Sequence, residues 1–177
     1  MSYKVHFSHA DEVIKHLSSI LPSVNDPFLK AKYVGFVSVA AVTVYELAIK
    51  SIFLDFSKNE NKILNCFTEK YFERINGRIK IKAIQDDYLT KFGDIYLNSF
   101  NKEIEISKIN FLKTNKRDFQ SAYKNLIEWR HQFAHQGTIN TTATFEEVVQ
   151  AYEDGKFVIE CLASVMFSQN KIASTPE

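Results

Sequence analysis

Residues 33–49 read YVGFVSVAAVTVYELAI, an apolar run that carries one charged residue, Glu46. The run is shorter than the roughly 20 apolar residues that cross a bilayer, and a second charge, Lys50, follows it directly. A helix that is apolar on all sides is buried among other helices. We therefore expect the central helix of a bundle and no membrane segment. The run is also rich in β-branched residues, so two strands over residues 33–44 are the alternative.

The flanking sequence extends this helix to residues 27–57. Asp26 is a suitable N-cap residue, and Pro27 stands at the first helical position, where its missing N–H costs nothing. Other apolar residues recur at helical spacing between turn signals. We expect further helices at residues 9–21, 61–75, 78–92, from 114 or 115 to 137, and 144–170, with a short helix plus a loop at 94–109.

Capping residues mark the ends of these helices. Ser8 can cap the first helix, with Asp11 in its first turn, where the helix dipole favours negative charge. Thr144 and Glu147 have the spacing of a capping box ahead of the last helix. Asn76–Gly77 can close a helix in the left-handed conformation, and Gly93 and Gly137 mark the ends of two others. The pattern predicts an all-α fold, an up-and-down helical bundle of about six helices.

The length of 177 residues fits one domain. We expect a single domain over residues 1–177, with its core at 27–170 and a disordered tail at 171–177. The two cysteines, Cys66 and Cys161, are isolated and flanked by apolar residues, so we expect buried thiols in a reducing compartment. The N-terminus lacks the continuous apolar core of a signal peptide. These features favour a cytoplasmic protein.

Charge and motifs exclude several classes of function. The net charge of +1 is too small for binding nucleic acid through bulk charge, so any such contact needs a local basic patch. Two basic stretches could supply one: Arg74, Arg78, Lys80 and Lys82, and then Lys108, Lys113, Lys116 and Arg117. Solvated helix faces are the alternative interpretation.

No metal or cofactor is expected. The histidines near the N-terminus, His6, His9 and His16, have no carboxylate pair nearby to complete a metal site, and we interpret them as surface residues. The sequence also contains no phosphate-binding G-x-x-x-x-G-K-[ST] loop, no G-x-G-x-x-G and no H-E-x-x-H.

The segment EWRHQFAHQG, residues 128–137, contains the best candidates for catalysis. Arg130 and His135 are about 140° apart around a helix, but His135 lies in the last turn, where fraying would let the two side chains converge. A guanidinium fork fits a phosphate, and a histidine at a helix C-terminus can exchange protons near neutral pH. The alternative is structural, with Arg130 paired to a carboxylate and His135 capping carbonyls.

An arginine and a histidine are enough for RNA cleavage without a metal, because the ribose 2′-hydroxyl is itself the nucleophile. One histidine cannot both remove and deliver a proton in the same step. Two identical sites facing each other across a two-fold axis would supply the second group. His131, next to Arg130, is the other candidate for that role.

The stretch WRHQFAHQG resembles the signature of the HEPN superfamily: an arginine, then four to six residues that begin with a polar one, then a histidine near the end of a long helix. Here these positions are Arg130, His131 and His135. The segment GRIKIKAIQDDYLTKFG, which ends in a Phe-Gly pair, resembles part of RiboL-PSP-type and MAE-type HEPN proteins. The resemblance extends over residues 27–170.

The resemblance implies a helical bundle that forms a homodimer with both motifs lining one cleft. It implies a metal-independent endoribonuclease that leaves 2′,3′-cyclic phosphate ends and acts as a toxin or an antiviral defence effector. Arg130 and His135 would be the catalytic pair, and His131 would support them. Glu46 would orient a motif side chain; a salt bridge to Lys50 is the alternative.

The sequence also departs from some relatives. After His135 it lacks the downstream Asp and Tyr found in HEPN toxins that pair with nucleotidyltransferase antitoxins. The sequence therefore does not favour an antitoxin of that type. The partners that we expect are RNA and an antitoxin of another kind or a larger defence-system protein. Two other functions stay open: a non-catalytic module that binds RNA or a partner protein, and a helical interaction domain in which Arg130 and His135 only close a helix.

Overall fold

A computed structural model describes residues 2–73, 77–137 and 143–168. Helices account for nearly all of these residues, and no strand occurs among them. The helices are α1 (Phe7–Ile20), α2 (Pro27–Glu60), α3 (Lys62–Phe72), α4 (Ile81–Ala83) with a π-helical turn (Ile84–Leu89) and α5 (Thr90–Phe92), α6 (Asp94–Asn115), α7 (Phe119–Gln136) and α8 (Phe145–Ser168). Since α4, the π turn and α5 are continuous, the described bundle has seven helices, and the all-α prediction is confirmed.

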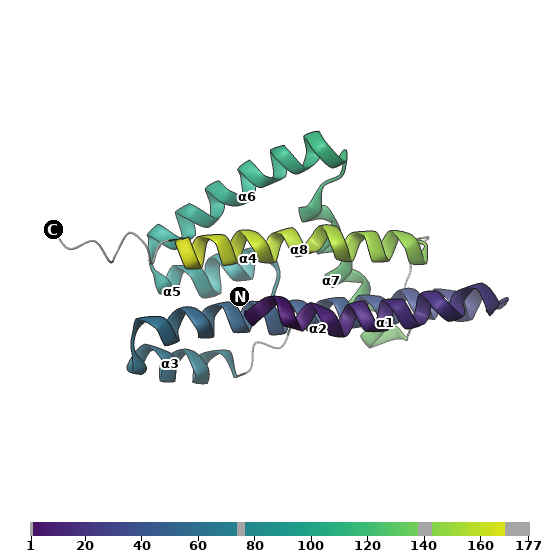
Figure 1. Cartoon of the computed structure of the whole chain (residues 1–177), viewed down its shortest axis with the longest axis horizontal. Coiled ribbons are helices and arrows are strands. Elements are labelled where there is room, and N and C mark those ends of the chain that lie inside the picture. Colours follow the sequence, from purple (N-terminus) through teal and green to yellow (C-terminus); the bar gives the residue numbers. More distant parts are fainter. Residues whose placement is uncertain (1, 74–76, 138–142, 169–177) are drawn as a thin grey trace.

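Helix α2 is the centre of the bundle. The Asp26 carboxylate accepts a hydrogen bond from the backbone N–H of Phe28 at 2.8 Å, as expected of the N-cap. The helix packs against α1, α3, α7 and α8 (Figure 1). This packing on several sides outweighs the low helix propensity of its β-branched residues, so the two-strand alternative for residues 33–44 is wrong.

Length and composition alone would let α2 cross a membrane. In its most apolar stretch, however, 56% of the residues are buried inside the bundle. The apolar surface of α2 is therefore largely used in packing against neighbouring helices.

Three tyrosines stack in the core where α2, α7 and α8 meet. Tyr45 lies 5.2 Å from Tyr123 and 5.9 Å from Tyr152 between ring centroids. Burial raises the pKa of Tyr45 and of Tyr123, which keeps both hydroxyls protonated as donors. The Tyr45 hydroxyl donates to the backbone carbonyl of Tyr152 at 2.5 Å. A Cβ on Gly155 would lie 2.6 Å from that hydroxyl, so the glycine allows the close approach of α8 to α2.

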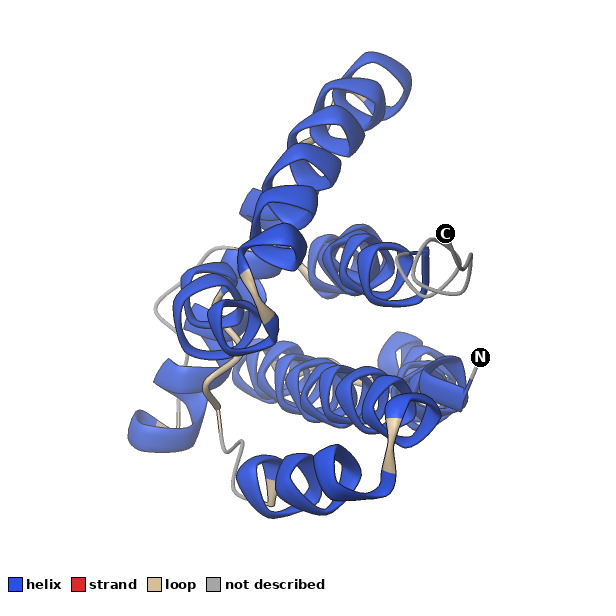
Figure 2. Ribbon diagram, turned by 90° about the vertical axis from the view of Figure 1, so that its left-hand side faces the viewer, coloured by secondary structure: helices blue, strands red, loops and turns tan. Residues whose placement is uncertain are grey.

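Helices α1, α2 and α8 run along the length of the molecule, and α7 crosses the far side of α2 and α8 (Figure 1). The end view in Figure 2 shows α6 projecting away from the rest of the bundle. Its N-terminal half stays close to the π turn and α5, and the helix also contacts α8. The arrangement leaves both sides of α7 available, one toward residues 77–80 and one toward α8.

The start of the chain differs from the sequence prediction. A 3-10 turn, Ser2–His6, precedes α1, so Ser8 lies inside the helix and its hydroxyl donates to the Val5 carbonyl at 2.7 Å. Ser8 is therefore not the N-cap. Asp11 lies beyond the first turn and accepts a hydrogen bond from the Tyr152 hydroxyl at 2.8 Å.

The helices between residues 94 and 119 also differ from those predicted from the sequence. The predicted short helix plus loop at 94–109 is wrong, because α6 is one helix of 22 residues. Helix α7 begins at Phe119 rather than at 114 or 115, since Lys116 takes a left-handed conformation (φ 58°) and Asp118 is the N-cap. The third helix ends at Phe72, short of the expected Ile75.

The capping box, the cysteines and the C-terminal tail were also predicted from the sequence. The capping box before α8 is confirmed: Thr144 and Glu147 exchange hydrogen bonds of 2.7 and 3.2 Å. Cys161 is buried, but Cys66 is exposed on α3, so the prediction of a second buried thiol is wrong. The tail at 171–177 lies outside the described residues.

Candidate active site

Helix α7 presents the three motif residues in regular helical geometry. The Asp118 carboxylate caps its start by accepting from the Gln120 N–H at 2.9 Å. At its end, Gly137 has φ 67° and donates its N–H to the Phe133 carbonyl at 2.9 Å, which confirms this glycine as the helix stop. Because the helix is intact through Gln136, His135 does not lie in a frayed turn. The expected route to convergence with Arg130 is therefore absent.

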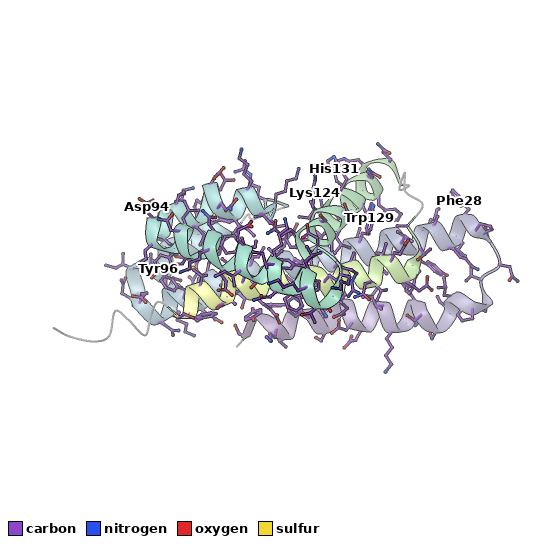
Figure 3. The ribbon with its side chains drawn as sticks, turned by 90° about the horizontal axis from the view of Figure 1, so that it is seen from above. Phe28, Asp94, Tyr96, Lys124, Trp129 and His131 are labelled. Atoms are coloured by element: carbon purple, nitrogen blue, oxygen red, sulfur yellow. The ribbon has the colours of Figure 1, made fainter. Side chains whose placement is uncertain are left out.

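The two motif histidines contact each other instead. His131 and His135 lie one turn apart on α7, with ring centroids separated by 4.4 Å and planes tilted by 57°. Both side chains are exposed to solvent. His131 lies on the outer side of α7 (Figure 3). The pair places two imidazoles side by side, so two proton carriers are available in one copy of the motif.

Arg130 and His131 share a cavity of about 250 Å³ beneath the loop that precedes α4. Gly77 and Lys80 line the same cavity. Lys80 is exposed, so its ammonium group adds a positive charge beside the Arg130 guanidinium. The Glu128 carboxylate also lines the cavity. An anionic group placed toward Arg130 and Lys80 would meet two cations and an imidazole, groups that can stabilise a transferring phosphate. His135 does not line the cavity and lies one turn beyond His131.

Glu46 on α2 holds Arg130 in place. The guanidinium of Arg130 lies 4.0 Å from the Glu46 carboxylate, and the side chains are 34% and 18% exposed. The structure shows no ion pair between Glu46 and Lys50, so Arg130 is the cation that Glu46 faces among the described residues. The expectation that Glu46 lies against a motif side chain agrees with this geometry.

Burial and the neighbouring groups have opposite effects on the pKa of the Glu46 carboxyl. Burial raises the pKa of this carboxyl, and the Arg130 guanidinium and the Gly77 backbone N–H offset part of that rise. One carboxylate oxygen of Glu46 is buried without a hydrogen-bond partner in the described structure. Arg130 is the cation that favours the charged form of this carboxyl, at the edge of the cavity.

Two tyrosines position the backbone next to Lys80. The Tyr123 hydroxyl of α7 donates to the Ile79 carbonyl at 2.7 Å, and the Tyr88 hydroxyl donates to the Arg78 carbonyl at 2.8 Å. Ile79 is fully buried between them. This anchoring fixes the backbone beside Lys80, which lines the same cavity as Arg130, a placement that the basic pattern of the sequence did not specify.

The end of α7 is fixed against α2 by an aromatic contact. Gly35 lies so close to the Phe133 ring that a Cβ at this position would overlap it. Phe133 also packs edge-to-face with Phe36 at 5.4 Å. Gly35 and Phe133 therefore set the position of the turn that carries His131 and His135, and neither was predicted as a site residue. A glycine inside an apolar helix is the signal that could have indicated close packing.

The basic stretches divide between two places. Arg78 and Lys82 are exposed on either side of Lys80 near the cavity, whereas Arg74 lies outside the described residues. The second stretch is at the opposite end of α7, where Arg117 pairs with Asp154 and Lys108 pairs with Asp118. Lys113 and Lys116 are exposed there. The structure does not bring this second group to Arg130.

In the described part of the chain, no group of three or more His, Cys, Asp or Glu side chains could hold a metal ion. The carboxylates nearest Arg130 are Glu46, which faces its guanidinium, and Glu128, which lines the same cavity.

Comparison with known proteins gives the family of the chain. The RiboL-PSP-HEPN family model matches residues 7–166 and so includes α1, ahead of the resemblance noted at residues 27–170. No curated protein and no solved structure matches the chain. The chain belongs to the RiboL-PSP-HEPN family. This membership indicates a ribonuclease or an RNA-binding module.

Proposed function

We propose that the protein is a metal-independent endoribonuclease whose catalytic residues are Arg130 and His135. The observation that carries the proposal is the position of Arg130. It faces the Glu46 carboxylate, shares a cavity with Lys80 and His131, and belongs to the same helix end as the contacting imidazoles of His131 and His135.

The residues suit cleavage by internal attack. The ribose 2′-oxygen forms a bond to the adjacent phosphorus, and its proton passes to one imidazole. The bond from phosphorus to the 5′-oxygen breaks, and a second imidazole, protonated, gives its proton to that oxygen. Arg130 and Lys80 stabilise the charge on the phosphate as the bonds change. The products are a 2′,3′-cyclic phosphate and a 5′-hydroxyl.

The active form that we propose is a homodimer with both motifs lining one cleft. Phe36 and Leu47 support this arrangement. They are 45% and 39% exposed, and they lie on one face of α2 because they are three helical turns apart. Their sequence neighbours Gly35 and Glu46 contact α7, so an apolar face borders the candidate site.

We further propose a cytoplasmic toxin or antiviral defence effector, held in check by an antitoxin or a larger defence-system protein. The intact Arg130 and His135 support this role, because a ribonuclease that is active on cellular RNA needs a partner or a trigger to restrain it.

The substrate test compares an RNA oligonucleotide with the same sequence in DNA, each incubated with the protein in EDTA. We expect cleavage of RNA only, with 2′,3′-cyclic phosphate ends identified by mass spectrometry. Cleavage of the DNA strand, or RNA products with free 3′-hydroxyls, would show that the 2′-oxygen is not the nucleophile. Binding of RNA without cleavage would instead identify a non-catalytic module.

A further inference from the structure

A second concave site lies on the other side of α7, between this helix and α8. It is an open groove of about 420 Å³, within the range of about 300–1,000 Å³ typical of small-ligand sites. The groove exists because both helices place small residues where they face each other, Ala122 on α7 and Ala151 on α8. Ala143, ahead of α8, widens its end.

Trp129 forms the aromatic wall of this groove. It is the one tryptophan of the chain, and it lies on the side of α7 that faces α8, whereas His131 and Lys124 lie on the outer side (Figure 3). Trp129 directly precedes Arg130, and successive side chains are about 100° apart around a helix. The groove and the Arg130 cavity are therefore neighbours on the same turn of α7.

Most of the charged groups in the groove have partners. The Arg117 guanidinium makes two hydrogen bonds to the Asp154 carboxylate, at 2.7 and 3.0 Å, and Asp154 is only 5% exposed. Asp118 pairs with Lys108 at 3.5 Å, and Glu147 accepts from the Thr144 backbone N–H at 2.7 Å. Arg117 is neutralised by Asp154, and Glu147 keeps its negative charge, so the groove does not favour a phosphate and suits a neutral, planar ligand.

Two amides supply polar contacts beside the tryptophan. Asn125 and Gln150 line opposite sides of the groove, on α7 and α8, and both are exposed. The Gln150 amide nitrogen donates to Asp154 at 3.0 Å, so its carbonyl oxygen remains available as an acceptor. An aromatic face with amides at its rim is the combination that binds an unpaired nucleobase, by stacking and by hydrogen bonds to the base edge.

We propose that this groove binds one nucleobase of a single-stranded RNA substrate, stacked on Trp129, while a neighbouring phosphate lies at Arg130. The choice of RNA as the polymer rests on the proposed ribonuclease function. The base site would hold the strand across α7 and orient the scissile phosphate, and the strand must be single because a paired base cannot leave its stack to enter the groove.

The intrinsic fluorescence of Trp129 reports whether a base stacks on it. The His135→Ala variant of the full chain, which should bind without cleaving, is titrated with a short single-stranded RNA and with an abasic strand of equal length, and tryptophan fluorescence is recorded. We expect saturable quenching by the base-containing strand and little by the abasic one, because only a base can stack on the indole. Equal quenching by the two strands, or none by either, would overturn the proposal.

A second experiment tests the role of Trp129 by measuring RNA affinity from the fluorescence anisotropy of a labelled strand. Trp129→Leu, made in the same His135→Ala background, should weaken binding about tenfold or more, and Trp129→Phe should restore part of it. Phe67→Leu is the matched control, since Phe67 is 64% exposed on α3, away from the groove. Unchanged affinity in a folded Trp129→Leu variant would count against the groove.

The two proposals can fail separately. Quenching by base-containing strands with no cleavage by the wild type would retain the groove and reject the ribonuclease. Cleavage by the wild type without base-dependent quenching would retain the ribonuclease and reject the groove.

Discussion

At the scale of single residues, Glu46 makes the stability of the protein depend on pH. Its folded-state pKa is raised, chiefly by burial, so the folded protein binds this proton more tightly than the unfolded chain does. Protonation of Glu46 therefore adds to the free energy of unfolding as pH falls through the raised pKa, and the gain is absent at higher pH. Arg130 would then lose its anionic partner in the same range.

Glu46→Gln tests this account. The amide is neutral at all pH values, so we expect the variant to be at least as stable as the wild type at about pH 8 and to lose that advantage toward about pH 5. Urea unfolding of both proteins across this range measures the difference in free energy. A difference that stays constant with pH would show that Glu46 does not titrate between the two states.

The contact between His131 and His135 predicts an order of effects on cleavage. His135→Ala should lower the rate by about 10²-fold or more, as expected for loss of a general acid or base. His131→Ala should have a smaller effect, because His131 supports the imidazole that it contacts at 4.4 Å between centroids. The double variant should be no slower than His135→Ala, since residues that act as a unit are not additive. Single-turnover cleavage assays measure all three, and independent, multiplying effects would contradict a shared role.

At the scale of helices, the contact between α2 and α7 predicts the effect of one methyl group. Gly35→Ala would gain helix propensity but force the Phe133 ring away, and overpacking of this kind costs about 1–3 kcal/mol. We expect lower stability and slower cleavage, because the displaced turn carries His131 and His135. Adding Phe133→Leu should restore part of both losses. Thermal unfolding and cleavage rates of the two single variants and the double variant give the coupling, and additive effects would contradict the contact.

The same scale shows what the sequence could and could not predict. Helix α2 was predictable from its apolar run and from Asp26. Helix α6 was not, because exposed apolar residues such as Ile95, Ile106 and Ile109 blur the periodicity of its buried ones. The start of α7 was missed because a lysine, Lys116, takes the left-handed conformation that glycine usually signals.

Within the candidate site, Arg130, His131, His135 and Glu46 could be predicted from the family resemblance, whereas spacing alone did not distinguish them from structural residues. The place of Lys80 in the same cavity could not be predicted, since it depends on hydrogen bonds from the Tyr88 and Tyr123 hydroxyls to the backbone just before Lys80. Tyr123 is 44 residues away from the carbonyl that it contacts. The groove at Trp129 depends on facing alanines of two helices, which one-dimensional patterns do not reveal. Pairings across helices thus needed the folded structure.

At the scale of the whole molecule, the exposed apolar face beside the site predicts a dimer. Light scattering should give twice the chain mass of 20.5 kDa at micromolar concentration. Leu47→Glu places a charge on this face and should yield a folded monomer with little cleavage activity. Ile63→Glu is the matched control, because Ile63 is 83% exposed on α3, and it should stay dimeric and active. A wild-type monomer with full activity would contradict the two-site cleft.

The central claim is that Arg130 and His135 cleave RNA without a metal, and its most direct test is gel analysis of mixed cellular RNA incubated with purified protein in EDTA. The wild type is compared with Arg130→Ala and His135→Ala, and with His9→Ala as a control, since His9 is an exposed histidine on α1. All four must show equal thermal stability. We predict cleavage by the wild type and His9→Ala, and a loss of about 10²-fold or more in the other two. Undiminished cleavage by either motif variant, or activity that returns only when magnesium is added, would contradict the claim.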